Sequence, residues 1–148
     1  ESTTMRLTGN SSKSGLIPSL LEFMRENPQL PVLGTCAGAI LLADPRDGKN
    51  SLIGSSIIRN GYGRQNESFQ AEIYSNLLMR NYPGIFIRAP KFSSIEDSNS
   101  VIATFGKDVV GVRKFNRIAL SFHPELSHDN GFHRWLVDQA IIYSELLV

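Results

Sequence analysis

Apolar residues recur at helical spacing near both ends of this chain. The first stripe predicts an amphipathic helix that ends near residue 26, before Asn27-Pro28, and consists of Leu16, Leu20, Phe23 and Met24. The second stripe follows a polar Asp129-Asn130 pair that could cap a helix, and it consists of Phe132, Leu136, Ala140, Tyr143 and Leu147. We expect this C-terminal helix to pack onto a sheet.

Between these helices, short β-branched or aromatic runs alternate with turn residues. They predict strands at residues 31–33, 56–59, 85–88, 101–105, 109–114 and 118–122. Turn residues at 106–108 and 115–117 predict hairpins, whereas a helix over residues 37–43 follows the first strand directly. The polar run 64–69 predicts an exposed loop. Together these features predict one α/β domain over residues 1–148, a three-layer sandwich with a mixed sheet.

Composition narrows the class of protein. A chain of 148 residues with 41% hydrophobic residues, 20% charged residues and a net charge of +1 is typical of a soluble globular domain. This charge predicts no nucleic-acid partner, and no apolar run is long enough to predict a membrane span. The single cysteine excludes an internal disulfide and is typical of a reducing compartment, so we expect a cytoplasmic protein.

The lone cysteine lies in a segment with the features of a nucleophile elbow, Gly34-Thr35-Cys36-Ala37-Gly38. A predicted strand ends there, a helix begins directly afterwards, and small flanking residues would let the backbone pass close by. The helix N-terminus would favour the nucleophilic thiolate of Cys36, and the Ala37 amide would point toward a developing oxyanion. The alternative is a buried, inert cysteine, which is common for a free thiol.

A cysteine nucleophile needs a base, and His123 follows the predicted strand 118–122. Glu125 lies two residues further on, so in an extended segment its carboxylate could orient the imidazole. Taken alone, His-Pro-Glu could equally be a surface loop. Arg59 and Arg88 each end a predicted strand and could bind an α-carboxylate through the guanidinium fork.

No metal or cofactor site is predicted. His128 and His133 lack partners at ligand spacing, and one cysteine with scattered histidines forms no zinc motif.

Five segments make the chain resemble a known family. They are Glu1-Ser2-Thr3-Thr4-Met5, Gly34-Thr35-Cys36-Ala37-Gly38, the stretch Arg59-Asn60 with Gly63-Arg64-Gln65 and Glu67-Ser68-Phe69, Phe86-Ile87-Arg88-Ala89-Pro90, and Ser121-Phe122-His123-Pro124-Glu125-Leu126. The chain resembles the glutaminase subunit of pyridoxal 5'-phosphate synthase, the PdxT/SNO family of class I (triad) glutamine amidotransferases. The resemblance implies a flavodoxin-like fold.

The resemblance also implies a reaction and a partner. Cys36 would attack the L-glutamine side-chain amide to form a γ-glutamyl thioester, with His123 as acid and base and Glu125 as its orienter. Substrate contacts would come from Glu1, Ser2, Arg59, Ile87 and Arg88. Ammonia would pass to a (β/α)8-barrel synthase subunit that makes pyridoxal 5'-phosphate, the vitamin B6 cofactor.

One departure from the family qualifies this expectation. Family members have a further N-terminal segment that carries the first strands of the sheet and a glycine amide of the oxyanion hole. We therefore expect the chain to be N-terminally incomplete, and the activity of this chain alone stays open. The alternative function is a non-catalytic binding or scaffold subunit of the same complex, and a relative that hydrolyses another amide is disfavoured.

Overall fold

The structure is a computed structural model that describes residues 1–10, 15–64 and 67–148. Its helices are α1 (Ser2–Gly9), α2 (Leu16–Glu26), α3 (Ala37–Ala43) and α4 (Gly131–Leu146), with 3-10 turns η2 (Ser98–Ser100) and η3 (Pro124–Leu126). Its strands are β1 (Val32–Thr35), β2 (Ser56–Ile58), β3 (Ser68–Ser75), β4 (Arg80–Ile87), β5 (Lys91–Ser93), β6 (Val101–Phe105), β7 (Asp108–Lys114) and β8 (Arg117–Leu120).

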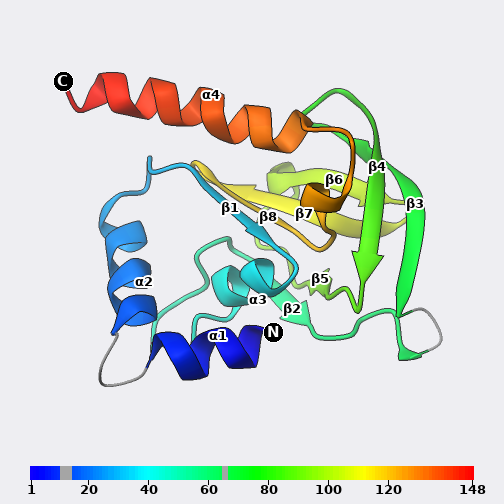
Figure 1. The fold of residues 1–148 in the computed structure, drawn as a ribbon, viewed down its shortest axis with the longest axis horizontal. Coiled ribbons are helices and arrows are strands. Elements are labelled where there is room, and N and C mark those ends of the chain that lie inside the picture. The colour runs from blue at the N-terminus through cyan, green and yellow to red at the C-terminus, as the bar shows by residue number, and fades with distance from the viewer. Residues whose placement is uncertain (11–14, 65–66) are drawn as a thin grey trace.

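Six strands form the main sheet in the order β1-β8-β7-β6-β3-β4, and β2 pairs with β5 in a separate ribbon. The β1–β8 pair is parallel and the other pairs are antiparallel, so the sheet is mixed. In Figure 1, α4 lies on one face of the sheet, whereas α1, α2 and α3 lie on the other. The predicted α/β sandwich with a mixed sheet is confirmed.

The two faces of the sheet bury separate hydrophobic clusters. On β8, Ala119 packs with α2 and α3, whereas its neighbours Ile118 and Leu120 pack with Phe132 of α4. This alternation follows from the two-residue repeat of a strand, whose successive side chains point to opposite faces. Because both faces of β8 are covered, all of its four residues are buried.

Most local predictions are confirmed. Helix α3 and strand β6 have the predicted bounds, and the turns at 106–108 and 115–117 join antiparallel neighbours. Strands β3 and β5 were not predicted, and β4 begins five residues before the predicted run at 85. The loop expected at 64–69 is wrong for Ser68 and Phe69, which belong to β3, while residues 65 and 66 lie outside the described residues.

The buried stripe of α2 differs from the prediction by one residue. Met24 is buried as predicted, together with Ile17 and Leu21. The predicted Leu16, Leu20 and Phe23 are instead 61%, 40% and 48% exposed. Both stripes are apolar, so helical periodicity alone could not choose between them.

Helix α4 packs on the sheet only through its beginning. Of the predicted stripe, Phe132 is fully buried and Leu136 and Tyr143 are partly buried, but Ala140 is exposed and Leu147 is 70% exposed. The helix extends past β1, the edge strand of the described sheet (Figure 1). The prediction that this helix packs onto the sheet is therefore confirmed at its beginning, through Phe132, and the packing does not reach the end of the stripe. None of the helices in the described residues is both long and apolar enough to span a membrane.

Candidate active site

Cys36 occupies the sharp turn between β1 and α3. Its backbone has φ 45° and ψ −100°, a left-handed conformation that is uncommon for a residue with a side chain. Its amide donates to the carbonyl of Leu120 in β8 at 2.9 Å, which ties the turn to the sheet. Cys36 is 8% exposed, and it lines the adjacent pocket.

The two glycines of this turn have different roles. A Cβ on Gly34 would lie 2.6 Å from the Leu42 side chain and 3.0 Å from the backbone of Gly38, so the close approach of β1 and α3 requires glycine there. A Cβ on Gly38 would meet no atom within 4 Å. The predicted close passage of the backbone is thus confirmed at Gly34, which lies against Gly38, although Gly38 itself has room for a side chain.

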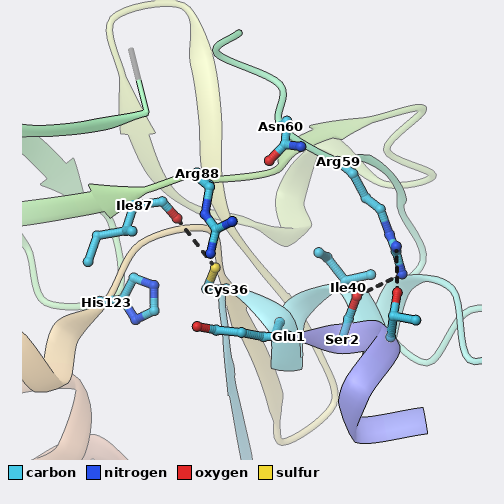
Figure 2. A pocket seen from close by; sticks show the side chains of 11 residues that line it. Glu1, Ser2, Cys36, Ile40, Arg59, Asn60, Ile87, Arg88 and His123 are labelled. Atoms are coloured by element: carbon cyan, nitrogen blue, oxygen red, sulfur yellow. Dashed lines mark hydrogen bonds between the residues drawn. The ribbon is translucent and has the colours of Figure 1, made fainter. Parts of the chain in front are cut away.

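His123 lies just beyond the end of β8, beside Cys36 in Figure 2. Its amide donates to the carbonyl of Ile85 at 2.8 Å, so β4 fixes the backbone of the histidine. Its Nδ1 lies 2.5 Å from Oε1 of Glu125, which is in η3. The imidazole is therefore held on one edge by the carboxylate of Glu125, and it contacts Cys36 on another edge.

These contacts change the protonation of the imidazole. The hydrogen bond to Cys36 and, after it, the hydrogen bond to Glu125 raise the pKa of His123 to about 9, although burial opposes the shift. The ring therefore carries a proton at neutral pH. The Cys36 sulfur also lies 3.8 Å from the carbonyl oxygen of Ile87.

A pocket opens over the sulfur, and its wall comes from segments far apart in the sequence. Figure 2 shows side chains from the start of α1, the turn into α3, the loop after β2 and the end of β4 around Cys36. The lining residues are Glu1, Ser2, Thr3, Cys36, Ala37, Ile40, Arg59, Asn60, Ile87, Arg88 and His123. The residues predicted for the site thus lie together, with Glu125 behind His123.

The two predicted arginines are held differently. Arg88 follows β4 with φ 44°, and its amide donates to the carbonyl of Glu67. Its side chain extends toward Cys36 in Figure 2. The Arg59 guanidinium instead donates to Ser2 Oγ at 2.7 Å and Thr3 Oγ1 at 3.1 Å, so it joins the β2 loop to α1.

Three lining residues were not predicted: Thr3, Ile40 and Asn60. Asn60 has φ 48°, and asparagine adopts this conformation more readily than most residues. Its position directly after Arg59, in front of Gly61, was a signal that could have identified it. Among the residues that the structure describes, no three His, Cys, Asp or Glu side chains gather into a possible metal site.

Comparison with known proteins identifies the family. The model of the SNO glutamine amidotransferase family matches residues 1–142. The chain belongs to the SNO glutamine amidotransferase family. It is 43% identical to the pyridoxal 5'-phosphate synthase subunit PdxT of Streptomyces griseus, over 95% of this chain and 73% of that protein. The PdxT subunit of Thermococcus onnurineus is 38% identical over the same shares of the two chains.

Solved structures agree with this membership of the SNO family. A crystal structure of a glutamine amidotransferase superposes with a TM-score of 0.79 at 34% identity, over 95% of this chain and 75% of that one. A glutamine amidotransferase from Thermotoga maritima superposes with a TM-score of 0.55 at 17% identity and shares the fold. The α/β sandwich is thus the fold of glutamine amidotransferases.

Proposed function

We propose that residues 1–148 form one glutaminase domain that hydrolyses L-glutamine to glutamate and ammonia. The observation that carries the proposal is the contact of Cys36 with a protonated His123 that Glu125 holds from behind. A nucleophile, a proton carrier and an orienter in this order can cleave an amide by acyl transfer.

The reaction would proceed in two steps. In the first, the Cys36 thiolate attacks the side-chain amide carbon of glutamine, and His123 gives its proton to the departing ammonia. The product is a γ-glutamyl thioester. In the second, His123 takes a proton from water, which attacks the thioester carbon and releases glutamate and the thiolate. Each step passes through an oxyanion, and the Ala37 amide in the first turn of α3 has no partner within the helix and can stabilise it.

The substrate's polar ends match the charges of the pocket. Two guanidiniums, Arg59 and Arg88, line the wall, and an α-carboxylate is the group that such a fork binds best. Arg88 is our choice for this carboxylate because its side chain extends over Cys36, whereas Arg59 holds Ser2. The carboxylate of Glu1 is available for the α-ammonium group, and the backbone of Ile87 completes the wall.

We further propose that the ammonia is consumed by a (β/α)8-barrel subunit of pyridoxal 5'-phosphate synthase. The support is the family, whose similar members are named as subunits of that synthase. Neither a metal nor a cofactor is needed for the thioester chemistry, since thiolate, imidazole and water supply every transferred atom and proton.

The test is release of ammonia and glutamate from L-glutamine by the purified protein, with and without the synthase subunit. We expect release that depends on Cys36 and disappears in Cys36→Ala, while the variant still binds the synthase subunit. Ammonia from Cys36→Ala would refute the nucleophile. Absence of ammonia under both conditions would overturn the catalytic proposal and favour the alternative, a binding or scaffold subunit.

A further inference from the structure

A buried hydroxyl lies beneath the turn that carries Glu125. The Tyr82 side chain, on β4, is 1% exposed. Its hydroxyl donates to the carbonyl of Asp129 at 2.6 Å and lies 3.5 Å from the carbonyl of Pro124. Burial raises the pKa of Tyr82, so the hydroxyl stays a donor throughout the neutral range. One phenol therefore contacts the backbone on both sides of Glu125.

The same strand holds this segment at two more points. At its start, the His123 amide donates to the carbonyl of Ile85 at 2.8 Å. At its end, the Arg80 guanidinium binds both carboxylate oxygens of Asp129, at 2.5 and 2.8 Å. β4 thus fixes residues 123–129 at both ends, at His123 and at Asp129. The longer contact of the Tyr82 hydroxyl, at 3.5 Å, reaches the carbonyl of Pro124, which directly precedes Glu125.

Glu125 depends on the position of the η3 backbone, which is also closed by main-chain hydrogen bonds from Leu126 to His123 at 3.2 Å and from Ser127 to Pro124 at 3.1 Å. Its side chain is 45% exposed, yet its Oε1 must stay within hydrogen-bond reach of Nδ1 of His123. An exposed glutamate has several rotamers, so the backbone of η3 determines where its carboxylate lies. A loose turn would let Glu125 turn toward water and leave the imidazole unoriented.

We propose that Tyr82 is a positioning residue for the glutaminase reaction, and that its hydroxyl fixes the η3 backbone so that Glu125 stays aligned with His123. The inference rests on the proposed function. Tyr82 does not line the substrate pocket, so its effect belongs to the chemical step and not to glutamine binding.

The first experiment is Tyr82→Phe, which removes the hydroxyl and keeps the ring. Loss of one buried hydrogen bond predicts about a 5-fold fall in kcat with an unchanged KM for glutamine. The matched control is Tyr74→Phe, on the neighbouring β3, where the side chain is 44% exposed and kcat should not change. An unchanged kcat in Tyr82→Phe, or a change confined to KM, would overturn the inference.

A double-mutant cycle with Glu125 separates positioning from a general loss of stability. If Tyr82 acts through Glu125, Tyr82→Phe lowers kcat in the parent chain but has no further effect in a Glu125→Gln background. Equal factors in both backgrounds would refute the inference. Should Tyr82→Phe fail to fold, Arg80→Gln, which releases Asp129 at the surface, must show the same dependence on Glu125.

A readout without turnover distinguishes failure of this inference from failure of the proposed function. Titration of His123, followed by NMR, should give a lower pKa in Tyr82→Phe than in the parent, because Glu125 no longer stabilises the imidazolium fully. This lower pKa of His123 is expected even if the protein releases no ammonia. Absence of ammonia release would overturn the proposed function but not the role of Tyr82. An unchanged His123 titration would overturn the role of Tyr82.

Discussion

The guanidinium of Arg6 donates to the main-chain carbonyl of Asp44, and so joins the helix that carries Ser2 to the helix that begins after Cys36. A second bond, 2.9 Å long, runs from Arg6 to the carbonyl of Pro45. Arg6, a residue of α1, is 8% exposed. Its guanidinium lies at the C-terminal end of α3, where a cation also interacts favourably with the helix dipole. The contact fixes α1 against α3, and thereby one wall of the pocket against the nucleophile.

Replacement of Arg6 by Met tests this link. The carbonyls of Asp44 and Pro45 would lose their buried donor, which predicts a loss of about 1 to 3 kcal/mol in the free energy of unfolding. Ser2 would no longer be fixed relative to Cys36. The KM for glutamine should therefore be higher than in the parent chain, when both are measured at a temperature well below the melting temperature of the variant. Arg46→Met is the control, since the Arg46 side chain is 59% exposed. An unchanged KM in a destabilised Arg6→Met would contradict the link.

The protonation of His123 gives a pH prediction. Its pKa is raised to about 9, so the folded chain keeps the imidazole proton between pH 6.5 and about 9, where a free imidazole loses it. The contact with Cys36 is the largest cause, so Cys36→Ala should move the midpoint down toward the ordinary value. NMR titration of the parent chain and of Cys36→Ala measures this directly. A midpoint near 6.5 in the parent chain would be inconsistent with the contact.

Gly61 sets the distance between the two loops that carry the arginines. Its amide donates to the carbonyl of Ala89 at 3.1 Å, and a Cβ at this position would lie 2.8 Å from the backbone nitrogen of Lys91. Gly61→Ala should therefore push the loops apart, destabilise the fold by about 1 to 3 kcal/mol and raise the KM for glutamine.

Gly38→Ala is the matched control for stability, because its new methyl group meets no atom within 4 Å. Thermal unfolding of both variants, with KM for Gly61→Ala, checks the prediction. Equal stability of the two variants would show that the loops can absorb the methyl group.

The parts of the fold that local patterns encode were predictable from the sequence. The turn around Cys36 was found because a short strand, two glycines and an apolar helix are adjacent in the chain. Strand β3 was missed because most of its residues are exposed or only partly buried, so it lacks the apolar run that marks an inner strand. Its place in the sheet depends on β4 and β6, to which it pairs.

Contacts between distant residues account for most of what the sequence did not reveal about the site. The residue types of Cys36, His123 and Glu125 indicated their chemistry, but the bond of Arg59 to Ser2 spans 57 positions and that of Tyr82 to Asp129 spans 47. A tyrosine in a strand looks like any core aromatic residue until the fold shows what its hydroxyl meets.

The backbone of Cys36 has a thermodynamic consequence. At φ 45° a side chain costs about 1 to 2 kcal/mol that glycine avoids. Cys36→Gly should therefore be more stable than Cys36→Ala by about 1 kcal/mol, as chemical denaturation would measure, although neither variant has a nucleophile. Equal stability would mean that the turn relaxes around alanine. The nucleophile thus occupies a place where folding alone would select glycine, and the chain trades stability for reactivity at this one residue.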